Sequence, residues 1–111
     1  MRDIEVRTLL QAEGDRLDRE LAVIRSELAE FAGGQGPAGE TERADEIATE
    51  HVERQNDQLR LGDLERHRAE VTAALERVEA GTYGSCTVCG VAIPDERLHA
   101  IPWTRTCVDH A

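Results

Sequence analysis

The sequence of 111 residues contains no lysine, so all 13 of its basic residues are arginines. Asp and Glu together number 23, which gives a formal net charge of −10 at pH 7. Proteins bind the phosphate backbone of nucleic acids through basic side chains that displace counterions, so this charge argues against nucleic acid as the main partner. The excess acidic residues could keep a helical protein soluble, or they could form a surface that binds a basic partner. The composition leaves both interpretations open.

Long apolar runs and aromatic residues are also scarce. No run approaches the ~20 apolar residues that a membrane helix needs, and the first ten residues, MRDIEVRTLL, lack the apolar core of a signal peptide. We therefore expect a cytoplasmic protein without a membrane span. Phe31, Tyr83 and Trp103 are too few aromatics for a conventional globular core of this size. The 32% of charged residues is typical of extended helices with a narrow apolar seam.

Apolar residues at alternating spacings of three and four predict one helix over residues 2–32. This is the 3.5-residue repeat of a coiled coil. The seam positions are Leu10, Gly14, Leu17, Leu21, Ile24, Leu28 and Phe31.

A second helix is expected from about Glu42 to Ala80, because Gly81 can end it. Its seam is clear in the second half, with Arg68 as an exception, and poorer in the first half. The clear positions are Leu61, Leu64, Val71, Leu75 and Val78, and the poorer ones are Ile47, Val52 and Leu59.

Four glycines and a proline fall within residues 33–39, between the two predicted helices. In a helix interior each glycine costs about 1 kcal/mol and a proline about 3 kcal/mol, so this segment cannot continue a helix. Because the periodicity resumes directly after it, we interpret the segment as the reversal loop of a hairpin. The sequence therefore predicts a mainly α fold, in which residues 1–80 form a long antiparallel helical hairpin, or coiled coil, with a glycine-rich tip at 33–39.

All three cysteines and one histidine fall in two pairs with i, i+3 spacing. Cys86-Thr-Val-Cys89 comes first, and Cys107-Val-Asp-His110 follows after an interval of 17 residues. Such pairs let two ligands reach one tetrahedral zinc ion from a single tight turn. In the cytoplasm paired cysteines favour metal over a disulfide. We predict that residues 81–111 form a zinc finger with one structural Zn²⁺, bound by Cys86, Cys89, Cys107 and His110.

Other arrangements of this site stay open from the residues alone. His99, Asp109 or water could replace His110 as the fourth ligand. Three cysteines with a bound water would superficially fit a catalytic zinc, but no glutamate stands in a recognised hydrolytic motif, so we expect no enzyme. His51 and His67 lie sixteen residues apart, point to no common site and are expected on the surface.

The finger segment resembles the DksA/TraR family of bacterial zinc-finger proteins. The resemblance rests on residues 81–94, Gly-Thr-Tyr-Gly-Ser-Cys-Thr-Val-Cys-Gly-Val-Ala-Ile-Pro, on the run 73–80 before them, and on Arg97, Leu98, Ala100 and Pro102. Members of this family are helical hairpins that insert their tip into the secondary channel of RNA polymerase. Their acidic tip residues act near the active-site metal and alter transcription initiation without specific DNA binding. The resemblance implies a transcription regulator of this kind, and we expect it to be a monomer.

Three departures from the family pattern accompany the resemblance. His110 stands where the family usually has a fourth cysteine, and larger members continue with a helix after the finger. The family's tip pattern, Asp-x-x-Asp-x-Ala, corresponds to residues 43–48, where Arg43 replaces the first acid while Glu46 and Ala48 fit. The tip acids implied are Glu42, Asp45 and Glu46.

The acidic cluster at the start of the second predicted helix could also have a purely structural role, since carboxylates complement the positive end of the helix dipole. The alternative function is an adaptor that binds some other protein through its helical seam or its finger. The sequence does not tell which promoters would respond or whether an effector nucleotide binds.

Overall fold

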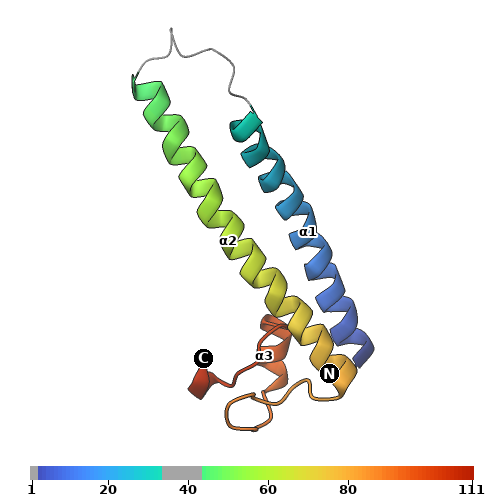
Figure 1. The fold of residues 1–111 in the computed structure, drawn as a ribbon. Coiled ribbons are helices and arrows are strands. Elements are labelled where there is room, and N and C mark those ends of the chain that lie inside the picture. Colours follow the sequence, from blue (N-terminus) through green and yellow to red (C-terminus); the bar gives the residue numbers. More distant parts are fainter. Residues whose placement is uncertain (1–2, 34–43) are drawn as a thin grey trace. The chain divides into compact units, whose positions relative to one another are not determined.

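The computed structural model describes residues 3–33 and 44–111, with side chains for 3–30 and 51–111 (Figure 1). The elements are α1 (Asp3–Gly33), α2 (Ala44–Ala80), the short helix α3 (Asp95–Ala100) and the 3-10 turn η2 (Val108–His110). Within these ranges, one isolated antiparallel β-bridge joins Ser85 and Ala92. The fold is a helical hairpin followed by a small C-terminal finger, which confirms the predicted fold class.

Both long helices begin and end within two residues of their predicted bounds. Gly33 ends α1, and the rest of the predicted reversal loop lies outside the described residues. Phe31 and Ile47 lie on the helices, but their side chains are outside those described. Neither long helix, over the residues described, is apolar enough to span a membrane.

The chain separates into two compact units. The first comprises residues 1–17 with 67–111, and the second comprises residues 18–66. The division into a hairpin at 1–80 and a finger at 81–111 stays a prediction.

A buried seam between α1 and α2 forms the core of the first unit. Each of its six apolar side chains is at most 5% exposed, and burying a valine or leucine side chain from water stabilises a fold by about 1.5–3 kcal/mol. These residues are Val6, Leu10 and Leu17 on α1, and Val71, Ala74 and Val78 on α2. Arg7 and Glu79 add an ion pair of 2.9 Å at the edge of this seam.

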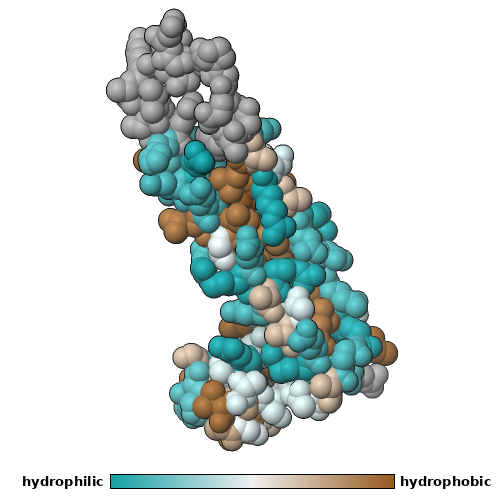
Figure 2. Space-filling view, viewed as in Figure 1, coloured by the Kyte–Doolittle hydropathy of each residue, from teal (hydrophilic) through white to brown (hydrophobic). Residues whose placement is uncertain are grey.

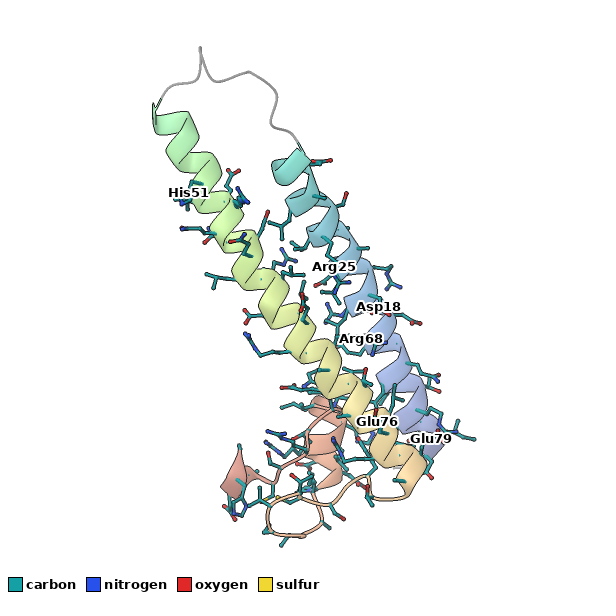
Figure 3. All side chains as sticks on the ribbon, viewed as in Figure 1. Asp18, Arg25, His51, Arg68, Glu76 and Glu79 are labelled. Carbon is teal, nitrogen blue, oxygen red and sulfur yellow. The ribbon has the colours of Figure 1, made fainter. Side chains whose placement is uncertain are left out.

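The two irregular seam positions of the sequence face each other in this unit. A Cβ atom added to Gly14 would lie 3.1 Å from Cζ of Arg68, so the guanidinium group rests against the glycine backbone. Nη1 of Arg68, which is labelled in Figure 3, also donates a hydrogen bond of 3.0 Å to Oγ1 of Thr72. The missing side chain on α1 therefore makes room for a long one on α2.

The second unit buries fewer apolar side chains. Leu21 and Ile24 are each 3% exposed and Leu64 is 9% exposed. Val52 and Leu59 are 52% and 70% exposed, so their predicted place in the seam is wrong. Polar side chains cover most of the visible surface, as Figure 2 shows. The ion pairs between the helices, such as Arg25–Glu65 at 4.0 Å, are half exposed and contribute at most about 1 kcal/mol each.

Candidate metal centre

The chain leaves α2 through a hydrogen-bonded glycine cap. The N–H of Gly81 donates to the carbonyl of Val78 at 3.2 Å, and the N–H of Thr82 donates to that of Arg77 at 2.9 Å. Gly81 has a φ of +75°, which a residue with a side chain rarely adopts. These two bonds form a Schellman motif, which ends α2 and directs the chain toward the first pair of cysteines. The predicted role of Gly81 is confirmed.

The first pair, Cys86 and Cys89, lies in a tight turn. The N–H of Gly90 donates to the carbonyl of Cys86 at 2.9 Å, and the N–H of Cys86 donates to the carbonyl of Val91 at 2.8 Å. Gly90 has a φ of +77°, which a residue with a side chain rarely adopts. The turn brings both sulfur atoms of the pair to the same side of the backbone.

In the second pair, Cys107 directly precedes η2 and His110 is the last residue of η2. The N–H of His110 donates to the carbonyl of Cys107 at 3.1 Å, which closes the turn. The N–H of Thr87 donates to the carbonyl of Arg105 at 2.9 Å and joins the two turns directly. The two halves of the site are therefore held together by the backbone as well as by the ligands.

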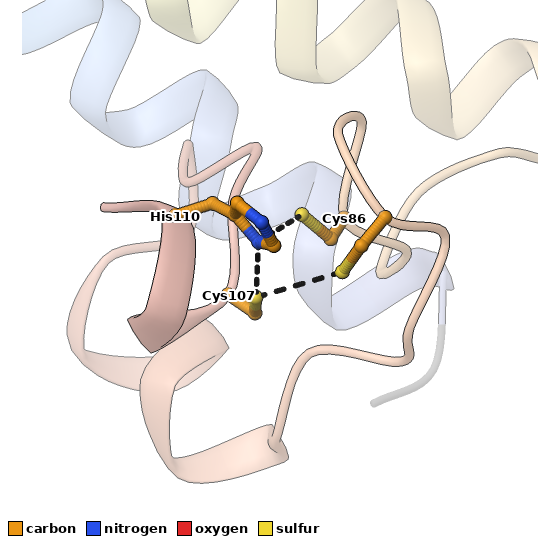
Figure 4. Close-up of side chains that lie close together, drawn as sticks. Cys86, Cys107 and His110 are labelled. Atoms are coloured by element: carbon orange, nitrogen blue, oxygen red, sulfur yellow. Dashed lines mark hydrogen bonds between the residues drawn. The ribbon is translucent and has the colours of Figure 1, made fainter.

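Four ligand atoms converge at this junction (Figure 4). The three cysteine sulfurs and a ring nitrogen of His110 all lie within 4.8 Å of one another. Sγ of Cys89 is 3.7 Å from Sγ of Cys107. Nδ1 of His110 is 3.2 Å from Sγ of Cys107 and 4.0 Å from Sγ of Cys86.

These separations fit a tetrahedral zinc ion. Zn–S bonds of about 2.3 Å at tetrahedral angles place two sulfur ligands about 3.8 Å apart. Thiolates and an imidazole are also the ligands of structural zinc sites. The geometry and the donor set both support one structural Zn²⁺, and the histidine presents Nδ1 to the sulfurs.

The two rival ligands are not part of this group. Nδ1 of His99 donates a hydrogen bond of 2.9 Å to the carbonyl of Asp95, and the His99 side chain is exposed. Asp109 is exposed as well, and the convergent group of the described residues does not include its carboxylate.

Backbone hydrogen bonds lower the pKa of one cysteine thiol and so favour the thiolate form that binds metal. N–H groups of Cys89 and Cys107 donate hydrogen bonds to the sulfur of Cys86 and lower the pKa of this thiol to about 6. The N–H of Val91 lowers the pKa of the Cys89 thiol, but partial desolvation of its sulfur and the sulfurs of Cys86 and Cys107 outweigh that effect and raise it, although the residue is exposed. Zinc binds thiolates, so its positive charge would favour deprotonation of all three cysteines.

A small apolar cluster lies beneath the site. Cys86 and Cys107 are buried with Ile93 and Leu98, and Tyr83 packs against them. Cys89 and His110 are exposed. The position of Tyr83 in the sequence does not mark it as a member of this cluster.

Side chains also fix the segment between α3 and Cys107, and sequence reasoning missed these contacts. The hydroxyl of Tyr83 donates to the carbonyl of Pro102 at 2.8 Å, and Nε of Arg97 donates to that of Thr106 at 3.0 Å. Nη2 of Arg77, on α2, lies 3.3 Å from the carbonyl oxygen of Trp103 and 3.4 Å from that of Thr104. Burial lowers the pKa of the Arg77 guanidinium. No sequence motif marks such bonds, because they depend on where the loop places its carbonyls.

The two remaining histidines differ in their surroundings. His51, labelled in Figure 3, is exposed, and its ring lies 3.2 Å from the amide nitrogen of Gln55. His67 is half-buried, with its ring centroid 4.3 Å from that of Trp103. The expectation of a surface position therefore holds for His51 and is wrong for His67.

The predicted tip acids are outside what the structure describes. Glu42 precedes the first described residue of α2. Asp45 and Glu46 belong to the first turn of α2, but their side chains are outside the described residues. Their role stays a prediction.

Comparisons with known proteins agree with the fold and the finger. Residues 81–109 match the family model described as the prokaryotic dksA/traR C4-type zinc finger. A solved structure titled as transcription factor DksA2 from Pseudomonas aeruginosa is similar over 97% of this chain and 78% of that one, with a TM-score of 0.81 and 25% identity.

Curated relatives match over shorter stretches. An uncharacterized protein of Aquifex aeolicus is 60% identical over 38 residues, which are 34% of this chain and 26% of that protein. The uncharacterized protein YteA of Bacillus subtilis is 42% identical over 65 residues, or 58% of this chain and 27% of YteA. General stress protein 16O of the same organism is 48% identical over 40 residues, or 36% of this chain and 24% of that protein. The matched region is thus about a quarter of each relative. This chain carries a zinc finger of the DksA/TraR type, with a histidine at the fourth ligand position, on a DksA-like helical hairpin.

Proposed function

We propose that this protein is a non-enzymatic, zinc-binding transcription regulator that acts on bacterial RNA polymerase. The observation that carries the proposal is the likeness of 97% of the chain to a solved transcription factor, DksA2. The dksA/traR finger match at residues 81–109 supports it independently. We also propose that the protein works in the cytoplasm and is a monomer.

The proposed ligands of the zinc ion are Cys86, Cys89, Cys107 and His110. When bound, the ion would cross-link the two turns of a module too small to be held by burial alone, and its binding free energy would contribute to folding. In the compact unit that contains the finger, Arg77 of α2 then binds the carbonyls just before Cys107. The zinc site is thereby connected to the hairpin and has a bracing role.

The proposed contact with the polymerase is the tip of the hairpin. Glu42, Asp45 and Glu46 would present carboxylates near the polymerase's active-site metal, as the family resemblance implies. A net charge of −10 and the lack of lysine disfavour a competing role in DNA binding. The regulator would thus reach transcription through the enzyme and not through a promoter sequence.

The proposal is tested first by binding. The zinc-loaded chain should be retained by immobilised, purified bacterial RNA polymerase at low salt, and unlabelled DksA2 should displace it because both would occupy the same surface. If the immobilised polymerase does not retain the chain at low salt, the proposal is contradicted. An adaptor that binds a different protein is then the better-supported function. Retention that DksA2 does not displace shows a polymerase partner but a different surface.

A further inference from the structure

The segment that leads into the second ligand pair is irregular. Ile101 caps the C-terminus of α3, and residues 102–106 then lead to Cys107 without helix or strand. Holding an irregular backbone in one path costs conformational entropy at every residue. Since Cys107 and His110 can bind one metal ion together only when this path is fixed, other contacts must offset that cost.

Two side chains bind the first three carbonyls of residues 102–106. The hydroxyl of Tyr83 donates a hydrogen bond of 2.8 Å to the carbonyl of Pro102. Nη2 of Arg77 lies 3.3 Å from the carbonyl oxygen of Trp103 and 3.4 Å from that of Thr104, so its two N–H groups can reach one carbonyl each. These contacts are half-buried, where water competes less for the carbonyls.

The last two carbonyls of the segment are bound as well. The N–H of Thr87, in the turn of the first ligand pair, donates to the carbonyl of Arg105 at 2.9 Å. The carbonyl of Thr106 accepts bonds from Nε of Arg97 at 3.0 Å and from Oγ1 of Thr104 at 3.1 Å. Five successive carbonyls are thus bound, by donors from α2, from α3, from the chain between them and from the segment itself.

The donor side chains outside the segment act on the backbone, since they are not among the proposed zinc ligands. The backbone that they hold ends at Cys107, and the N–H of His110 donates to the carbonyl of Cys107 at 3.1 Å. Both ligands of the second pair therefore follow the position of this segment. Fixing a binding site in advance lowers the entropy that binding must offset, and so raises the affinity.

We propose that Arg77, Tyr83 and Arg97 are positioning residues that set the affinity of the zinc site. They do so by fixing the backbone that leads to Cys107 and His110. This inference rests on the zinc ligands proposed above. Because such coupling is reciprocal, the same bonds would be stabilised by the same factor when zinc is bound.

The zinc affinity of the full chain, measured by competition with a chelator, tests the proposal. Tyr83→Phe keeps the ring in the apolar cluster but removes the hydroxyl, so zinc binding should weaken by about 2- to 10-fold. Arg77→Met and Arg97→Met each remove a charged donor, and each should weaken binding by about tenfold or more. Arg105→Met is the matched control. The Arg105 side chain is exposed, and within the described part of the chain no carbonyl of residues 102–106 accepts a bond from it, so this variant should bind zinc like the wild type.

The fluorescence of Trp103 separates positioning from a general loss of stability, because Trp103 is the only tryptophan in the sequence and lies within the segment. A binding site that is formed only part of the time loses affinity by the fraction of time in which it is formed. In the metal-free Tyr83→Phe chain, the emission should therefore be shifted to longer wavelength than in the metal-free wild type, and zinc should reverse the shift. The helix content by circular dichroism should be the same in both.

Cys107→Ser in the same titration tests the ligand assignment by itself, since it removes a sulfur ligand. If Cys107→Ser loses affinity while Tyr83→Phe and both arginine variants retain it, the positioning role is overturned and the ligands stand. Full affinity in Cys107→Ser overturns both. A loss in Arg105→Met as large as in Arg77→Met also overturns the proposal, because removal of positive charge alone would explain it. Tyr83→Phe, which lacks a single oxygen atom, decides the matter if an arginine variant does not fold.

Discussion

At the scale of single residues, His110 decides what kind of zinc site this is. The spacing of the three cysteines alone predicts the thiolate ligands, because each cysteine belongs to an i, i+3 pair. The i, i+3 spacing from Cys107 predicts His110 as the fourth ligand but leaves His99 and Asp109 open, because spacing alone does not fix where a side chain points. The structure distinguishes them: Nδ1 of His110 lies 3.2 Å from Sγ of Cys107, whereas His99 bonds to the backbone of its own helix.

Removal of His110 should weaken zinc binding. Loss of the imidazole leaves three sulfur ligands, and because even a lost outer-shell partner reduces metal affinity by about 10–100-fold, we expect His110→Ala to lose at least as much. The wild type should bind about one zinc per chain. Competition with a chelator of known affinity measures the effect, with His99→Ala as the control that retains full affinity. Unchanged affinity in His110→Ala, or a loss in His99→Ala, would refute the ligand assignment.

At the scale of elements, the helices were predictable because their three-four periodicity is long and Gly81 stops the second one. The side chains that line the seam were predictable only where apolar residues are frequent. Val52 and Leu59 are exposed because polar neighbours in that half of α2 leave the buried face undefined. The contact of Gly14 with Arg68 could not be predicted. Each residue interrupts the apolar seam of its own helix, and the two fit together only when the helices are paired.

Two glycine substitutions should have opposite effects on stability. Gly81 has a φ of +75°, so Gly81→Ala strains the cap of α2, and we expect a loss of about 1 kcal/mol in the free energy of unfolding. Gly62 lies within α2, and a Cβ there would meet only Nη1 of Arg66, at 3.6 Å. Gly62→Ala should therefore gain up to about 1 kcal/mol from helix propensity. Denaturant unfolding of the zinc-loaded variants measures both, and a gain in Gly81→Ala would contradict the cap described for α2.

At the scale of the whole molecule, a hairpin and a finger could be inferred from the sequence, but the way the finger is attached could not. The bonds from Arg77, Tyr83 and Arg97 reach backbone carbonyls of one irregular segment, whose path no residue pattern specifies. The half-buried position of His67 beside Trp103 follows from that path as well. The sequence does show two helices and two pairs of metal ligands. A DksA-type hairpin and finger has the same features.

The central claim is that this hairpin regulates RNA polymerase through acids at its tip, and transcription itself tests it most directly. Purified bacterial RNA polymerase is assayed on a short-lived promoter complex with the zinc-loaded wild type, with Asp45→Ala/Glu46→Ala, and with Glu53→Ala/Asp57→Ala as a control pair elsewhere on α2. If the tip acids act on the polymerase, the wild type and the control pair should change the yield of initiated transcript equally, whereas the tip variant should still bind the polymerase but lose the effect. An unchanged transcript yield with bound wild type, or a tip variant as active as the wild type, would contradict it.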